Sequence, residues 1–161
     1  MEKKILDVTC GSRSIWFNKN HPLAVYCDIR QETNELKWIK QGRTSPCVVD
    51  PDVIADFTDL PFPDNEFSLV VMDPPHLEGL SEKSWARMKY GTLPGDWEIV
   101  LKEGFNECMR VLKPDGVLVF KWSEVRIPTS KLLEALGHEP LFGHKSGKKS
   151  NTNWLCFMKV S

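Results

Sequence analysis

The sequence predicts an α/β fold with a doubly wound, mostly parallel sheet of seven strands and an antiparallel hairpin at its C-terminal end. Short apolar segments typical of buried strands alternate with segments of helical periodicity. The last two apolar segments are joined without a helix, which favours an antiparallel pair. The length of 161 residues, with 41% hydrophobic and 27% charged side chains, suits one domain with one core.

The predicted strands are short apolar runs bounded by turn residues, such as the segment Pro61–Asn65. The expected strands are residues 4–8, 23–28, 53–56, 67–72, 117–122, 141–142 and 154–160. The run 67–72 is apolar except for Ser68, which is typical of a central strand that is buried on both faces.

Four helices are expected between these strands. The best supported one covers residues 96–112, with Asp96 as N-cap and apolar side chains at helical spacing. A helix over 129–136 ends at Gly137, which is a typical C-terminal residue. The remaining two are a helix that begins near Arg13 and a short one over 32–40. Residues 77–95 are rich in glycine and are expected to form a long irregular loop.

Composition excludes several classes of protein. No apolar run approaches the length of a membrane span, and the N-terminus has no apolar signal region, so we expect a cytoplasmic protein with no membrane contact. The five cysteines are odd in number and form no C-x-x-C pair, which predicts reduced thiols and no metal site. We expect residues 1–161 to form a single domain with no separate target-recognition domain.

Acidic residues lie at or near the ends of four predicted strands, at Asp7, Asp28, Asp56 and Asp73. In an open α/β sheet the ligand binds outside the carboxyl ends of the strands. These carboxylates therefore predict a line of acceptors along one crevice. The sequence has neither a G-x-G-x-x-G fingerprint nor a Walker lysine, so the expected ligand carries hydroxyl groups and a charged amino acid moiety instead of phosphates.

The most informative segment is Asp73-Pro74-Pro75-His76, directly after the central strand. Proline has no backbone N–H and its φ is restricted, so the segment forms a rigid loop. The loop offers a carboxylate, free carbonyl oxygens and an aromatic ring, which together suit the binding of a planar amine. This set of groups predicts methyl transfer to nitrogen.

With these features the chain resembles class I S-adenosylmethionine-dependent methyltransferases over nearly its whole length. The segment Asp7-Val8-Thr9-Cys10-Gly11-Ser12 stands where that family has its Gly-rich first motif, although only one glycine is kept. The segments 60–67 and 110–116 also resemble sequence patterns that are frequent in the family.

The resemblance implies that S-adenosylmethionine is the cofactor and assigns residues to it. Asp7, Thr9 and Gly11 would hold the methionine moiety, and Asp28 would accept hydrogen bonds from the ribose hydroxyls. Asp56 would meet the adenine amine with Phe57 beside the ring, and Asp73 would border the cofactor site. Those implied cofactor-binding residues are Asp7, Thr9, Gly11, Asp28, Asp56, Phe57 and Asp73.

The segment Asp73-Pro74-Pro75-His76 resembles the Asp-Pro-Pro-Tyr motif of enzymes that methylate exocyclic amines in DNA and RNA. This implies that Asp73 and the Pro74 carbonyl accept the two N–H bonds of the amine while His76 stacks on the base. Histidine stands in place of the usual tyrosine, and it can also carry a proton. The chain further resembles a small group of phage and prophage methyltransferases.

The expected function is an S-adenosylmethionine-dependent N-methyltransferase acting on nucleic acid, with adenine in DNA as the first choice. RNA bases, a protein glutamine amide and a non-catalytic cofactor-binding subunit remain open. The net charge is −1, although residues 121–161 carry 7 Lys and Arg against 3 Asp and Glu. Specificity for the target would come from residues 77–95, from the basic loop 143–153, from a homodimer or from a partner. Within residues 77–95 the candidate substrate contacts are Trp85, Lys89 and Tyr90.

Overall fold

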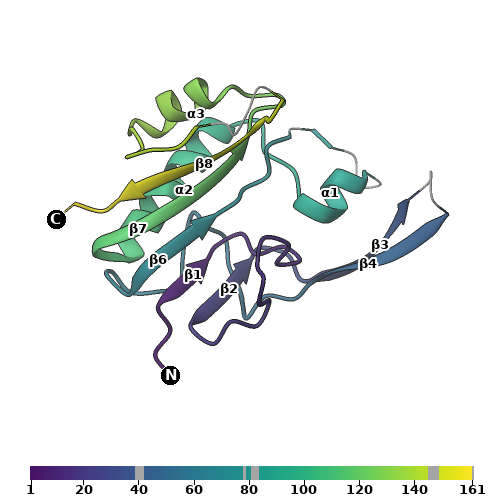
Figure 1. Ribbon diagram of the computed structural model, residues 1–161, viewed down its shortest axis with the longest axis horizontal. Coiled ribbons are helices and arrows are strands. Elements are labelled where there is room, and N and C mark those ends of the chain that lie inside the picture. Colours follow the sequence, from purple (N-terminus) through teal and green to yellow (C-terminus); the bar gives the residue numbers. More distant parts are fainter. Residues whose placement is uncertain (39–41, 78, 81–83, 145–148, 161) are drawn as a thin grey trace.

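The centre of the fold is a mostly parallel sheet, which has six strands among the described residues (Figure 1). The computed structural model describes residues 1–38, 42–77, 79–80, 84–144 and 149–160. In spatial order the strands are β5 (Val53–Ile54), β2 (Ala24–Asp28), β1 (Ile5–Asp7), β6 (Phe67–Met72), β7 (Leu112–Ser123) and β8 (Thr152–Met158). The pairs from β5 to β7 are parallel, and β8 runs antiparallel to β7.

The parallel α/β class and the antiparallel C-terminal strand are confirmed, but the predicted number of seven strands is wrong. Residues 141–142 make only an isolated bridge between Phe142 and Cys156. Leu141 and Phe142 are 62% and 68% exposed, so neither side chain of this short segment is packed into the core. The next residue, Gly143, has a φ of 140° and lies close against the backbone of Trp154 on β8.

The predicted helix over residues 32–40 is also wrong, because the chain forms an antiparallel hairpin there. Its strands are β3 (Glu32–Trp38) and β4 (Arg43–Val49), and the ribbon extends away from the main sheet (Figure 1). Within β3, Glu35 is exposed and its neighbour Leu36 is buried, because successive side chains of a strand point to opposite faces. Pairing with β4 decides the outcome. Residues 39–41 lie outside the described part of the chain.

The helix expected near Arg13 is replaced by a series of turns between β1 and β2. Arg13 has a φ of 57°, a left-handed conformation that interrupts a helix. Its guanidinium donates to the carbonyl oxygens of Lys19 and Asp50, which ties the turns to the rest of the chain. Trp16 packs edge-on against Tyr26 at 5.0 Å, so turns cover this face of the sheet where a doubly wound fold would have a helix.

The two longer helices pack together on the opposite face. They are α2 (Trp97–Val111) and α3 (Thr129–Leu136), which confirms the predictions for 96–112 and 129–136. Their buried side chains include Phe105 and Leu132, and these join Phe120 and Trp122 of β7 in the main core. None of the helices in the described residues is long and apolar enough to span a membrane.

A third, short helix was not predicted. Helix α1 (Trp85–Tyr90) lies within the segment 77–95 that was expected to be an irregular loop, and residues 78 and 81–83 of that loop are outside the described part. Ser84 caps the helix, because its hydroxyl accepts a hydrogen bond from the Arg87 N–H at 3.5 Å. Helix α1 contacts β3 and lies near the carboxyl ends of the parallel strands (Figure 1).

Candidate functional site

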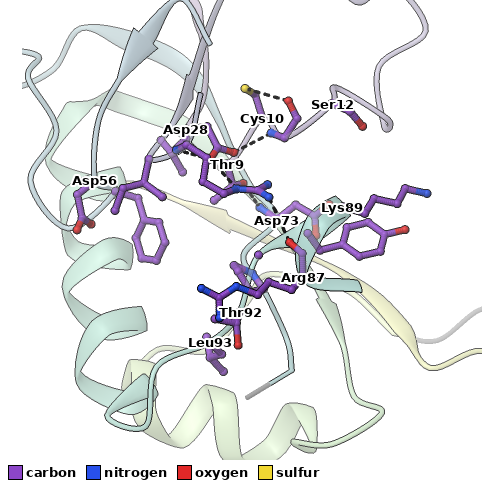
Figure 2. A pocket seen from close by; sticks show the side chains of 18 of the residues that line it. Thr9, Cys10, Ser12, Asp28, Asp56, Asp73, Arg87, Lys89, Thr92 and Leu93 are labelled. Carbon is purple, nitrogen blue, oxygen red and sulfur yellow. Dashed lines mark hydrogen bonds and ion pairs between the residues drawn. The ribbon is translucent and has the colours of Figure 1, made fainter. Parts of the chain in front are cut away.

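A cavity of about 420 Å³ opens at the carboxyl ends of β1, β2 and β6 (Figure 2). This volume lies in the range of small-molecule sites. The lining comes from the turn after β1, the end of β2, the segment after β5, the motif after β6, α1 with the residues that follow it, and Val100 of α2. In the view of Figure 2, Asp56 lies at one end of the cavity, Lys89 lies at the other, and Asp28 and Asp73 lie between them.

Seven of the ten sequence-predicted site residues line this cavity: Thr9, Gly11, Asp28, Asp56, Phe57, Asp73 and Pro75. Asp7, Pro74 and His76 are described but are not part of the lining. The tertiary structure therefore brings all the candidate cofactor residues except Asp7, together with the candidate catalytic carboxylate of Asp73, to one cavity.

The turn after β1 is held in place by hydrogen bonds to its neighbours. Gly11 has a φ of 49°, and its N–H donates to Asp28 Oδ2 at 2.9 Å. The Thr9 hydroxyl oxygen accepts the Asp73 N–H at 2.6 Å. The ends of β1, β2 and β6 are thus linked directly, and this linkage sets the distance between the turn and the carboxylate of Asp73.

Asp28 is buried and most of its hydrogen-bonding capacity is used by the protein. Besides Gly11, its carboxylate accepts the Arg30 backbone N–H at 2.9 Å and Arg30 Nε at 3.3 Å. A carboxylate has about four acceptor positions, so about one remains for a ligand hydroxyl. Arg30 Nη1 also donates to the carbonyl oxygens of Arg87 and Met88, which ties the end of β2 to α1.

Asp7 holds the turn after β1 from the side away from the cavity and is only 1% exposed. Its carboxylate accepts Trp16 Nε1–H at 2.7 Å and the Thr9 N–H at 3.1 Å. Burial raises the pKa of Asp7 from 3.8 to about 7, and the two hydrogen bonds oppose the increase. The geometry makes Asp7 a support of the first turn and keeps it out of the cavity wall.

Asp56 and Phe57 form the end of the cavity that lies after β5. Asp56 Oδ1 accepts the Thr58 N–H at 2.9 Å and the Thr58 hydroxyl at 2.8 Å, which fixes the orientation of the carboxylate. The Phe57 ring packs directly on Gly104 of α2, where an added Cβ would overlap the ring. Sequence reasoning missed Gly104. Glycine inside a helix lowers helix stability, so its presence at position 104 was a sequence signal for a close packing contact.

Asp73 is half-buried at the end of β6, and Lys121 of β7 is its charged partner. Lys121 Nζ lies 3.2 Å from Asp73 Oδ2. Burial raises the pKa of Asp73, while the Lys121 ammonium and, to a smaller extent, His76 lower it. Lys121 is a second residue that sequence reasoning missed. No sequence motif links Lys121 to Asp73, and only the pairing of β6 with β7 brings these two side chains together.

The remaining residues of the motif give the loop its shape. Pro74 is buried, and Pro75 Cγ would lie 3.3 Å from a Cβ added to Gly91, so the motif packs closely on the end of α1. The His76 ring centroid lies 6.4 Å from that of Tyr90. Burial lowers the pKa of His76, which favours the neutral imidazole at neutral pH.

The segment after the motif forms a wall of the cavity through Arg87, Lys89, Tyr90 and residues 91–94. Lys89 and Tyr90, the predicted substrate contacts, are therefore at the site. The side chain of Trp85 lies outside the described part of the chain. Residues 145–148 of the basic loop 143–153 also lie outside it.

Comparisons with known proteins bear on the fold. No protein-family model and no curated protein sequence matches the chain. Several solved structures share its fold, among them the following three. A protein of Pyrococcus horikoshii OT3 is 16% identical with a TM-score of 0.62, and the match covers 100% of this chain and 83% of that one. An S-adenosylmethionine-dependent methyltransferase of Methanosarcina mazei is 13% identical with a TM-score of 0.55, covering 99% and 93%.

The third is 1,6-didemethyltoxoflavin-N1-methyltransferase of Burkholderia thailandensis, solved with bound 1,6-didemethyltoxoflavin and S-adenosylhomocysteine. It is 12% identical with a TM-score of 0.54, and the match covers 99% of this chain and 72% of that one. At these identities the comparison shows the fold alone. The chain has the class I fold of S-adenosylmethionine-dependent methyltransferases.

Proposed function

We propose that this protein is an S-adenosylmethionine-dependent methyltransferase that methylates the exocyclic amine of a nucleic acid base, with adenine in DNA as the first candidate. One observation carries the proposal. The Asp73-Pro74-Pro75-His76 segment ends β6 at the cavity that Thr9, Gly11, Asp28, Asp56 and Phe57 line. A carboxylate able to hold an amine therefore stands beside a pocket suited to a methyl donor.

The cavity fits the chemistry of S-adenosylmethionine. Asp28 and Asp56 can accept hydrogen bonds from ribose hydroxyls and from the adenine amine, and Phe57 offers an aromatic face. The turn at Gly11 permits close approach of the backbone to the methionine moiety. When bound, the cofactor supplies a methyl group on a sulfonium centre, which is an excellent leaving group.

The residues of the chain would act by positioning the amine. An exocyclic amine is a weak nucleophile because its lone pair is shared with the ring. The Asp73 carboxylate and the Pro74 carbonyl would accept its two N–H bonds and direct the lone pair toward the methyl group. Asp73 could also take the proton that the methylated nitrogen must lose. Thr9 holds the Asp73 backbone, and the neutral His76 ring would stack on the base.

Access to the motif restricts the state of a nucleic acid substrate. A base inside a duplex cannot reach a carboxylate set in a cavity wall, so the target must be single-stranded or flipped out of the helix. Lys89 and Tyr90 lie on the wall next to the motif and are suited to contact the backbone and the base. Target choice would come from this wall, from a second copy of the chain or from a specificity partner.

A protein glutamine amide is a second candidate, because it also presents a planar NH₂ group. The net charge of −1 favours this candidate, since a protein that binds naked nucleic acid usually carries excess positive charge. Binding to DNA or RNA would weaken steeply with added salt, whereas binding to a protein target would depend on salt much less.

The proposal is tested by methyl transfer from labelled S-adenosylmethionine to single-stranded DNA, duplex DNA, RNA and host protein in parallel. We expect label in nucleic acid, and we expect Asp73→Asn to lower the rate by about 100-fold or more, a much larger factor than any loss of S-adenosylhomocysteine affinity measured by calorimetry. Asp115→Asn is the matched control, because Asp115 is exposed near the start of β7 and has a φ of 65°, which asparagine also tolerates. Label found in protein alone would overturn the nucleic acid substrate in favour of a protein target. An unchanged rate of methyl transfer by Asp73→Asn would refute the mechanism.

A further inference from the structure

Lys121 is a cation that the strand pairing of the sheet places beside the Asp73 carboxylate. Neighbouring side chains of β7 alternate between faces, so Phe120 and Trp122 enter the core while Lys121 points to the other face. Its Nζ donates to Asp73 Oδ2 at 3.2 Å and lies 5.7 Å from the centre of the Trp154 ring on β8. The two partners of the ion pair are 25% and 22% exposed, so water screens them only in part.

We propose that Lys121 is a positioning residue that holds the Asp73 carboxylate ionised and oriented for the target amine. The inference rests on the proposed methyl transfer for its catalytic meaning, although the effect of Lys121 on Asp73 can be measured without it.

Lys121 helps to fix the orientation of the Asp73 carboxylate. Asp73 is anchored at two points, since its N–H donates to Thr9 Oγ1 at 2.6 Å and its Oδ2 accepts from Lys121. The following Pro74 restricts the backbone further. Among the described residues no group donates a hydrogen bond to Oδ1, so Oδ1 is the oxygen left for a substrate amine.

Lys121 also affects the charge of the Asp73 carboxylate. An ionised carboxylate only accepts hydrogen bonds, whereas a protonated one presents an O–H donor and would repel an N–H bond at that oxygen. Burial raises the pKa of Asp73 and so favours the protonated form. Lys121 opposes this effect and is the cation that hydrogen-bonds the carboxylate within the described part of the chain.

Two other titratable groups face Asp73. His76 in the motif lowers the pKa of Asp73, but burial lowers the pKa of His76 itself, so the ring contributes little positive charge at neutral pH. Asp7 on β1 interacts unfavourably with Asp73 when both are ionised. Lys121 therefore supplies most of the positive charge that keeps Asp73 ionised.

The experiment compares pH profiles of methyl transfer for the wild type, Lys121→Met, Lys121→Arg and Lys113→Met. Lys113 is the matched control, since it lies on the same strand and pairs with exposed Glu2 at 3.7 Å. For Lys121→Met we expect the ratio of the rates at pH 8.5 and pH 6.0 to rise at least about fivefold over the wild-type ratio. Lys121→Arg keeps the cation and should restore the wild-type profile, and Lys113→Met should not alter it.

A second readout does not require activity. Carbon NMR of the labelled Asp73 carboxyl, assigned with Asp73→Asn, follows its titration directly, and Lys121→Met should move the midpoint to higher pH. An unchanged midpoint, or a loss of rate that is equal at all pH values, would overturn the inference and leave Lys121 as an ordinary ion-pair residue. If the wild type transfers no methyl group to any substrate, the proposed function fails, while the NMR titration still decides the role of Lys121.

Discussion

Asp7 is expected to make the protein less stable as the pH rises from 5 to 8. Its carboxyl is 1% exposed and is enclosed between the Trp16 ring and the turn at Thr9. Burial is the largest cause that raises its pKa, from 3.8 to about 7, and the nearby carboxylates of Asp73 and Asp28 add to the increase. Charge on Asp7 is therefore unfavourable in the folded state.

The sign follows from proton linkage. The folded state binds the Asp7 proton more tightly than the unfolded state does, so the stabilisation is complete below about pH 4 and is lost as the pH rises through about 7. Each pH unit between the two pKa values changes the free energy of unfolding by about 1.4 kcal/mol. Between pH 5 and pH 8 the contribution of Asp7 should fall by about 2.7 kcal/mol.

The substitution Asp7→Asn isolates this contribution, because asparagine does not ionise. At pH 5 the variant should be less stable than the wild type, since its NH₂ group replaces an acceptor that Trp16 or Thr9 requires. At pH 8 the difference should move in favour of the variant by about 2.7 kcal/mol. Urea unfolding followed by circular dichroism at both pH values measures it. A difference that stays constant within about 0.5 kcal/mol would refute the reasoning.

Two further predictions concern the cavity. Gly104→Ala would place a Cβ in overlap with the Phe57 ring, so it should destabilise the fold by about 1–3 kcal/mol and weaken S-adenosylhomocysteine binding in calorimetry. An unchanged affinity would show that the ring does not shape the cofactor site. Thr9→Val removes the acceptor of the Asp73 N–H and should cost about 1 kcal/mol in urea unfolding, with a larger fractional loss of methyl transfer rate than of cofactor affinity. Equal losses of both would contradict a role in holding Asp73.

Elements with a strong local signal were predictable. The helix α2 was predicted within one residue at each end, because Leu101, Phe105 and Cys108 follow a helical period along a continuous buried face. The strand β6 was predicted from its apolar run, and the acidic segment after it was placed correctly at a strand end. The rule that ligands bind at the carboxyl ends of parallel strands then brought Asp28, Asp56 and Asp73 to one cavity.

Elements that depend on distant partners were not predictable. The residues of β3 have weak preferences of their own, and only pairing with β4 makes them a strand. The turns after β1 depend on Arg13, whose guanidinium reaches the carbonyl of Asp50 in another part of the chain. Residues 141–142 form a bridge instead of a strand because their side chains have no core to enter.

By itself the sequence determined the α/β class, the order of the strongly periodic elements and the place of the Asp73-Pro74-Pro75-His76 segment directly after a buried strand, since all three depend on residues that are neighbours in the chain. Only the tertiary structure decided that Asp7 is enclosed behind the cavity, that Gly104 makes room for Phe57 and that Lys121 pairs with Asp73. The physical reason is that burial and charge pairing arise between residues far apart in the chain, and the packing of β6 against β7 and of α2 against the sheet brings those residues together.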